Sequence, residues 1–244
     1  AWAARLRGKP IIGLGHQYAF AHDAPRAGSN FIADLVMRYF APANESLGLH
    51  WHHFNAPILP PIIDPSLTRT TEVSNKIVVY LPFEDQARVQ KLLLSMPDYH
   101  FVIYAPELRD DERSNLSLRK TSHTAFKRDL MSANGVICNA GFELISECLH
   151  LGLAVLAKPQ GAQMEQLSNA AALQQLGYAS TMVSLDQTAI RNWLDSIEQP
   201  DQALRVNIHY PDVAKSIVEW IADGRRASIN SLSERLWRET TTNE

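Results

Sequence analysis

The sequence lacks several features that mark broad classes of protein. Only 2 of its 244 residues are cysteine, Cys138 and Cys148, which gives no disulfide framework or cysteine metal site and suits a reducing cytoplasm. No run approaches the roughly 18 apolar residues of a membrane span. The 23 basic side chains are outnumbered by 26 acidic ones and form no basic tract, so no nucleic-acid partner is expected.

What is present is the composition of a folded globular protein. Hydrophobic residues make up 45% and charged residues 20%, which is too apolar for a disordered chain. At about 100–200 residues per domain, the length allows one large domain or two small ones. Four prolines within residues 57–65 predict a stiff, extended connector and therefore a domain boundary.

Predicted strands and helices alternate through the region 76–210. The strands are expected at 76–82, 100–105, 116–120, 135–139, 153–158 and 178–183, and the helices at 84–96, 124–133, 142–151, 163–176 and 186–198. This alternation predicts an α/β fold with a parallel sheet covered on both faces. Residues 1–63 predict part of a second α/β unit, 64–75 a linker, and 211–244 two helices that pack back across the domains.

The segment most informative about function begins where a buried strand ends at Asn139. Gly141 allows a tight turn and a close approach of the backbone to a ligand, and the helix that follows offers free N–H groups and a positive dipole end to an anion. Glu147, on the second turn of that helix, suits the hydroxyls of a ribose. At the next strand end, Gln163, Glu165 and Gln166 suit the hydroxyls of a sugar. The alternative is that this glycine and these polar residues are ordinary turn and surface residues.

The motifs NAGF-x-x-x-x-E (139–147), G-x-x-V-x-x-x-P (152–159) and EQ-x-x-NA (165–170) decide between these interpretations. Together they resemble the nucleotide-sugar signature of GT-B glycosyltransferases, the group of the lipid-II-forming N-acetylglucosaminyltransferase and of UDP-glycosyltransferases. The resemblance implies a Rossmann-like C-terminal donor domain and part of a Rossmann-like N-terminal acceptor domain. It places the diphosphate at Gly141 and Phe142, the ribose at Glu147, and the donor sugar at Glu165 and Gln166.

The expected function is therefore transfer of a sugar from a nucleotide-diphosphate donor, UDP-linked, to an acceptor hydroxyl, with no metal and no cofactor. The alternatives are a nucleotide-sugar hydrolase or epimerase on the same fold, or a non-catalytic nucleotide-sugar-binding module. The acceptor is unknown. Because related enzymes often use lipid-linked acceptors, we expect a cytoplasmic protein that can also lie peripherally at the inner face of the membrane.

The resemblance implies that the family's opening Gly-rich loop, which usually supplies the catalytic base, would lie upstream, so an N-terminally truncated chain is expected. His16, after the predicted strand 10–14, should still face the interdomain cleft and suits a general base. The alternative is a loop histidine bonded to the backbone.

Two other features of the sequence each have two interpretations. His50 and His52 would share one face of a predicted strand at 49–54, but without a third ligand we favour a structural strand over a metal site. For a predicted apolar helix at Phe31–Phe40, we favour core packing over an acceptor groove or a membrane-facing patch.

Overall fold

The structure is a computed structural model that describes residues 1–28, 41–199 and 201–243. The N-terminal part contains α1 (Trp2–Leu6), β1 (Ile12–Gly15), the 3₁₀ helix η1 (His16–Ala21) and β2 (Glu45–Gly48). The central part contains β3 (Lys76–Tyr80), α3 (Gln86–Leu93), β4 (His100–Ala105), β5 (Asp111–Arg113), β6 (Leu116–Lys120), α4 (His123–Met131), β7 (Gly135–Asn139), α5 (Phe142–His150), β8 (Ala154–Lys158), α6 (Met164–Leu176), β9 (Ser180–Thr181) and α7 (Gln187–Ile197). The chain then forms β10 (Asn207–His209), α8 (Val213–Ala222), α9 (Ile229–Glu239) and β11 (Thr241–Asn243).

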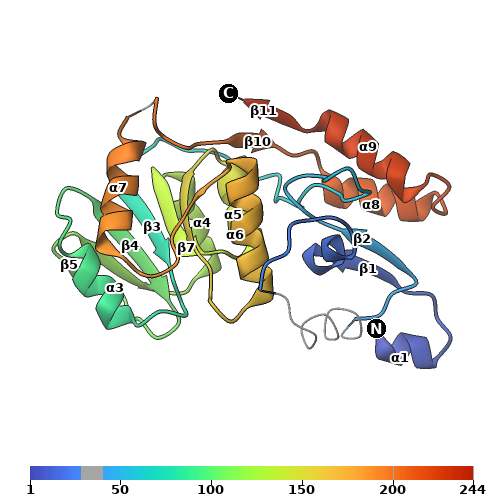
Figure 1. The fold of residues 1–244 in the computed structure, drawn as a ribbon, viewed down its shortest axis with the longest axis horizontal. Coiled ribbons are helices and arrows are strands. Elements are labelled where there is room, and N and C mark those ends of the chain that lie inside the picture. The colour runs from blue at the N-terminus through green and yellow to red at the C-terminus, as the bar shows by residue number, and fades with distance from the viewer. Residues whose placement is uncertain (29–40, 200, 244) are drawn as a thin grey trace.

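A seven-stranded sheet in the order β5-β6-β4-β3-β7-β8-β9 organises the central part (Figure 1). All neighbouring strands are parallel except β5, which pairs with β6 in the antiparallel sense. Ile77 and Val79 of β3 point into the core formed with α3 and α7, whereas Val78 points into the core formed with α4, α5 and α6. The sheet is thus buried on both faces, and the prediction of a Rossmann-like α/β domain is confirmed.

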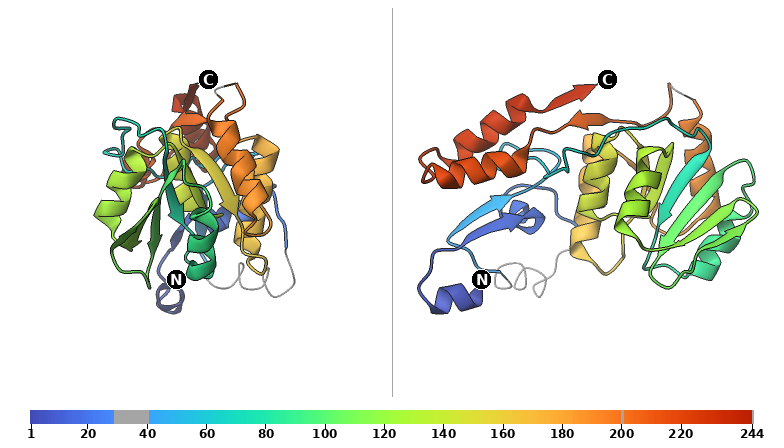
Figure 2. Two further views of the ribbon diagram at one scale, coloured as in Figure 1. Left: turned by 90° about the vertical axis from the view of Figure 1, so that its left-hand side faces the viewer. Right: turned by 180° about the vertical axis from the view of Figure 1, so that it is seen from behind.

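A smaller unit lies beside this sheet and carries the N-terminal elements. β1 and β2 pair in parallel as a two-stranded sheet, and η1 packs against them. Helices α5 and α6 stand between the two sheets (Figure 1 and the right-hand view of Figure 2). The N-terminal chain contacts α6 directly, because the Ser168 hydroxyl accepts the Ala27 N–H at 3.0 Å.

The C-terminal helices reach back to the N-terminal unit, and Figure 2 shows α8 and α9 running alongside β1 and β2. The carbonyl of Ile58 accepts hydrogen bonds from the Ser233 hydroxyl and the Trp237 indole N–H, each at 2.7 Å. An ion pair joins Arg225 to Glu45. These contacts anchor α9 on the loop that follows β2.

Several local predictions are wrong. Residues 49–54 do not form a strand; the strand of this region is β2, and Phe54 and Asn55 take left-handed backbone conformations with φ of 47° and 56° that end the extended chain. Directly after β1, the six residues His16–Ala21 form the 3₁₀ helix η1, which was not predicted. The short strands β5, β10 and β11 were not predicted at all. The predicted helix at Phe31–Phe40 falls in the segment outside the described residues.

Two further expectations concern the linker and the membrane. Residues 64–75 have no helix or strand, but the segment is held along α4 by hydrogen bonds from the Thr70 and Val73 N–H groups to Met131 and Ser132. Within the described residues, no helix is both long and apolar enough to cross a bilayer.

Candidate functional site

A cleft of about 770 Å³ opens where the carboxyl ends of β7 and β8 meet the N-terminal unit. The residues predicted to bind the donor or to act as the base all line it: His16, Gly141, Phe142, Glu147, Gln163, Glu165 and Gln166. They come from segments up to 150 positions apart in the sequence. The fold therefore brings the whole predicted set together, at the edge of a parallel sheet where ligands of such folds bind.

The N-terminus of α5 forms one wall of this cleft. Among the described helices α3 to α9, five begin at an Asp or Ser whose side chain accepts a backbone N–H, but α5 and α6 begin without a side-chain cap. The first N–H groups of an α-helix have no partner inside the helix. At α5 they are left for water or for an anionic ligand, which the positive end of the helix dipole also favours.

Of the two reasons expected for Gly141, a tight turn and a close approach to a ligand, the structure supports only the second. Its φ of −77° and ψ of 139° are open to any amino acid, so the turn itself needs no glycine. A Cβ built on Gly141 meets nothing within 4 Å. The absent side chain therefore leaves open space beside the helix N-terminus, which is the condition for a ligand to approach the backbone closely.

Phe142 lines the cleft although it is almost completely buried. The residue is 7% exposed, and its ring stacks on His16 at a centroid distance of 4.0 Å and on Trp51 at 5.3 Å. The Trp51 indole N–H also donates to the Ser146 hydroxyl at 2.8 Å, and Ser146 in turn donates to the carbonyl of Phe142. This packing fixes the first turn of α5 against the N-terminal unit.

Glu147 lies on the second turn of α5, and its carboxylate forms an ion pair with Lys127 of α4. The two side chains are 20% and 18% exposed, so the pair is largely shielded from solvent. One carboxylate oxygen, Oε1, is engaged by the lysine. Lys127 had not been singled out from the sequence, because its partner lies 20 residues further along on another helix.

The start of α6 supplies the second group of predicted residues. Gln163 is the exposed first residue of the turn into α6, Glu165 is half-buried in its first turn, and the buried Gln166 accepts the backbone N–H of Gln160 at 3.0 Å. Gln163 also lines an adjoining hollow of about 400 Å³. There Lys158, at the end of β8, pairs with Glu84 at 2.6 Å.

His16 sits at the floor of the cleft and is almost completely buried. Its Nδ1 lies 2.8 Å from the carbonyl oxygen of Leu49, and its Nε2 lies 2.7 Å from the side-chain oxygen of Asn169. Burial lowers the pKa of His16, against the opposing influence of these two oxygens. The alternative to a general base was a loop histidine bonded to the backbone, and the contact with Leu49 fits it. The ring also contacts a side chain of α6, that of Asn169.

Asn169 is a residue of the site that sequence reasoning quoted in a motif but gave no role. It is fully buried, and its amide donates to the carbonyl of Ala140 at 3.0 Å while its oxygen meets His16. Asn169 therefore ties the turn before α5 to the turn after β1. The only signal in the sequence was its place in the EQ-x-x-NA motif, four residues after Glu165.

The histidines near residue 50 hydrogen-bond to the backbone of their own loop. The Nδ1 atoms of His50, His52 and His53 accept the backbone N–H groups of Trp51, Phe54 and Asn55 at 2.8–2.9 Å, so they stabilise the turns of this loop. Burial lowers the pKa of His50 well below its usual range. Among the residues that the structure describes, no three His, Cys, Asp or Glu side chains are grouped to hold a metal ion.

The sequence profile of glycosyl transferase family 1 matches residues 27–198. No curated protein matches the sequence significantly. Solved structures that resemble this chain include the glycosyltransferase SsfS6 of Streptomyces sp. SF2575, with 12% identity and a TM-score of 0.53 over 96% of this chain and 61% of that one. The calicheamicin glycosyltransferase CalG4 has 13% identity and a TM-score of 0.51 over 80% of this chain and 61% of that one. The spinosyn rhamnosyltransferase SpnG has 16% identity and a TM-score of 0.51 over 82% and 62%.

At these identities the resemblance establishes the fold, which is GT-B. The chain spans about three fifths of the length of each of these three structures. The family profile, in contrast, covers more than half of the present sequence, including β7, α5, β8 and α6 with their predicted donor residues. The chain therefore belongs to glycosyl transferase family 1.

Proposed function

We propose that the cleft binds a nucleoside-diphosphate sugar, UDP-linked, and that the chain forms the donor side of an enzyme that transfers this sugar to an acceptor hydroxyl. One observation carries the proposal: the ends of β7 and β8 bring an uncapped helix N-terminus, a carboxylate and an acid–amide pair to one cleft. Family membership and the GT-B fold support it. Because the chain spans only part of the length of the similar structures, sugar transfer by this chain is part of what we propose.

In this proposal the diphosphate lies at the N-terminus of α5, over the open space at Gly141. The backbone N–H groups there donate to its oxygens, and the helix dipole favours its negative charge. Glu147 accepts a hydrogen bond from the ribose through the oxygen that Lys127 leaves free. Glu165 and Gln163 read the hydroxyls of the donor sugar, while the carboxamide of Gln166 shapes the turn before α6.

The reaction is a direct displacement. The acceptor oxygen forms a bond to the anomeric carbon while the bond from that carbon to the diphosphate oxygen breaks, and the nucleoside diphosphate leaves with the electron pair. Negative charge grows on the departing diphosphate, where fixed N–H groups and the dipole of α5 stabilise it without having to reorganise. The proton of the acceptor hydroxyl passes to a general base.

The geometry favours a positioning role for His16 over the role of that base. A general base needs a nitrogen whose lone pair faces the acceptor hydroxyl. Both ring nitrogens of His16 instead lie within hydrogen-bond distance of protein oxygens, and the ring face is stacked on Phe142. In the proposal, His16 holds the N-terminus of α5 in place.

Titration calorimetry with UDP tests the donor site. We expect UDP to bind the wild-type chain, and Glu147→Ala to weaken this binding by about tenfold, because a hydrogen bond to a charged group contributes roughly 1.5–3 kcal/mol. Glu219→Ala, an exposed carboxylate of α8 outside the cleft, is the matched control and should bind UDP as the wild type does. No UDP binding to the wild type, or equal affinities for Glu147→Ala and the control, would refute the donor site.

Release of UDP from UDP-glucose and UDP-N-acetylglucosamine separates transfer from hydrolysis. A transferase releases UDP faster when a panel of acceptor alcohols is added and yields the corresponding glycosides. Equal release with and without acceptors, with free sugar as the product, would identify a hydrolase that uses the same donor residues.

A further inference from the structure

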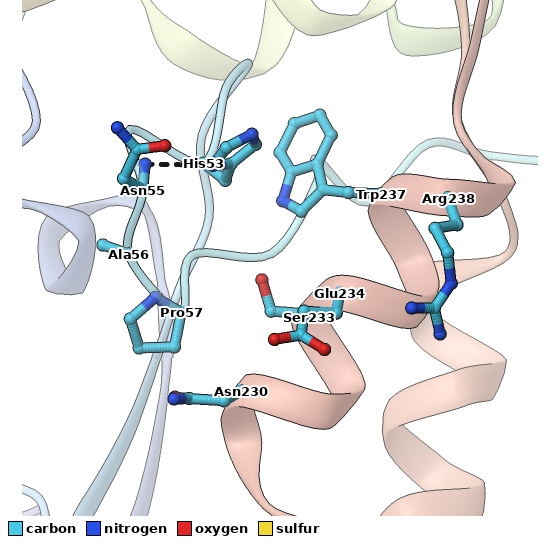
Figure 3. Close-up of a pocket in the computed structure, with 9 residues that line it drawn as sticks. All are labelled: His53, Asn55, Ala56, Pro57, Asn230, Ser233, Glu234, Trp237 and Arg238. Atoms are coloured by element: carbon cyan, nitrogen blue, oxygen red, sulfur yellow. Dashed lines mark hydrogen bonds between the residues drawn. The ribbon is translucent and has the colours of Figure 1, made fainter.

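A second hollow, of about 530 Å³, lies between the loop after β2 and helix α9 (Figure 3). Nine residues line it: His53, Asn55, Ala56, Pro57, Asn230, Ser233, Glu234, Trp237 and Arg238. It shares no lining residue with the donor cleft. Its volume is within the range of about 300–1,000 Å³ that is typical of sites for small molecules.

The hollow has fixed walls. On one side, α9 is held by the Ser233 and Trp237 hydrogen bonds to the carbonyl of Ile58. On the other side, the His53 ring accepts the N–H of Asn55 at 2.9 Å and keeps this residue in its left-handed conformation. Figure 3 shows this bond, with Asn230 directed from α9 toward the loop. The space between loop and helix is therefore preformed, as ligand sites usually are.

One wall of the hollow is aromatic and apolar. The rings of His53 and Trp237 lie 5.8 Å apart with their planes at 64°, and Ala56 and Pro57 continue the surface. Trp237 is half-buried, and its indole N–H is already used, so what it offers a ligand is apolar ring surface. Such a wall suits the C–H face of a ring-shaped ligand.

The rim of the hollow is polar and nearly neutral in charge. Asn55, Asn230, Glu234 and Arg238 are exposed, and their side chains make no hydrogen bond or ion pair within the part of the chain that the structure describes. Two amides, one carboxylate and one guanidinium supply both donors and acceptors in planar, two-pronged groups. The single negative and single positive charge favour neither an anion nor a cation.

We propose that this hollow is a second ligand site and that it binds a saccharide. A saccharide combines an apolar C–H face with a rim of hydroxyls that each donate and accept, which matches an aromatic wall edged by planar polar groups. The site is separate from the donor cleft: the two share no lining residue, and Phe142 of the cleft connects to His53 of the hollow only through a series of ring contacts that involves Trp51, His50, Phe54 and His52. The proposal goes beyond glycosyl transfer: the bound saccharide is held, and not consumed, at this site.

Saturation-transfer NMR on the whole chain tests the proposal with free glucose, galactose, N-acetylglucosamine, rhamnose, maltose and chitobiose. We expect at least one of these sugars to bind, and saturating UDP to leave its binding unchanged. Asn230→Ala and Glu234→Ala should each weaken its affinity at least fivefold. Both residues are exposed, so these variants should melt at the wild-type temperature.

Arg235→Ala is the matched control, since it removes a charged side chain from the same helix outside the hollow. It should bind the sugar as the wild type does. The proposal is overturned if none of the six sugars binds. It is equally overturned if UDP displaces the bound sugar, or if Asn230→Ala and Glu234→Ala bind it as tightly as Arg235→Ala.

Discussion

Two strand-to-helix turns meet at the donor cleft, and both follow the same sequence pattern. β1 ends at Gly15 and η1 begins at His16, while β7 leads through Gly141 to Phe142, the first residue of α5. The first helical residues of the two turns stack on each other with their planes 6° from parallel. One turn belongs to the N-terminal unit and the other to the large sheet, so this stack is a direct contact between them.

The two glycines differ in what makes them necessary. Gly15 has φ of 157° and ψ of 166°, a conformation that is essentially restricted to glycine, whereas the conformation of Gly141 is open to all residues. A Cβ at either position would meet nothing within 4 Å. Gly15 is thus required by its backbone, whereas Gly141 is distinguished by the space that it leaves. The same sequence pattern therefore serves stability at one turn and, in our proposal, ligand access at the other.

The largest effect on this contact is expected from His16→Ala. The substitution removes the stack on Phe142 and the single N–H of the neutral ring, so the oxygen of Leu49 or Asn169 that accepts this N–H is left buried without a donor. Because an unsatisfied buried polar group costs roughly 1–3 kcal/mol, we expect a loss of about 3 kcal/mol in the free energy of unfolding. Urea denaturation followed by circular dichroism measures it.

His123→Ala, at the exposed start of α4, is the control for this substitution and should stay within about 0.5 kcal/mol of the wild type. A double-mutant cycle with Asn169→Ala should show a coupling of roughly 1–2 kcal/mol between the two residues. If His16→Ala were as stable as the control, the ring would be free for another role, and the positioning role would be abandoned.

Gly15→Ala should have the second largest effect. With no steric contact at the added Cβ, the cost is backbone strain alone, which is about 2 kcal/mol for such a conformation. Thermal unfolding measures it as a lower midpoint. An unchanged midpoint would mean that η1 can start from an ordinary extended residue, and the distinction between the two glycines would fail.

The large sheet could be predicted from the sequence because its signals are local. β4 and β7 are largely buried apolar runs and β6 alternates leucine with polar residues, and the predicted bounds of all three strands match the structure residue for residue. The helices between them carry Asp or Ser caps or follow a glycine. Strands β5, β10 and β11 have three residues each, and their pairing partners decide their existence, so no local pattern announces them.

The candidate site could be predicted only in part for the same reason. Gly141, Glu147 and Glu165 follow strand ends in a recognisable spacing, so they could be named from the sequence. The partner that holds His16 could not be predicted, because Asn169 lies 153 residues from it in the sequence. The segment 49–54 was misassigned because its alternating aromatic and histidine residues imitate a strand, whereas its ring nitrogens cap turns.

Gly141→Ala tests the second turn, the one that leads from β7 into α5. We expect about tenfold weaker UDP binding, because the methyl group enters the space beside the α5 N-terminus, a loss of about 1.4 kcal/mol. The stability of the folded chain should stay within about 0.5 kcal/mol of the wild type, since alanine lowers the entropy of the unfolded state but is a poorer N-cap residue than glycine. Calorimetry and urea denaturation of the same sample separate the two effects. Loss of stability together with affinity would assign Gly141 the role of Gly15.

The smallest expected effect is a pH dependence of the stability of the folded chain, which we assign to His50. The ring of His50 packs against that of His16 at a centroid distance of 5.0 Å. Burial lowers the pKa of His50 most, and the neighbouring His16 and His52 lower it further. Because the unfolded chain binds a proton near pH 6.5 that folded His50 does not, stability is full above pH 6.5 and falls as the pH is lowered.

Each such histidine contributes at most about 1.4 kcal/mol per pH unit, and His16 and His52 have the same sign because burial lowers their pKa values too. His50→Asn keeps an acceptor for the Trp51 N–H but removes the titrating ring, so its stability should fall less steeply between pH 6.5 and 5.5 than that of the wild type. Carboxylates such as Asp129, whose pKa is lowered by the hydrogen bonds from Lys76 and Tyr104 in spite of burial, titrate below this window. Urea midpoints at half-unit pH steps measure the two slopes, and parallel slopes would show that His50 is protonated in the folded chain as readily as in the unfolded one.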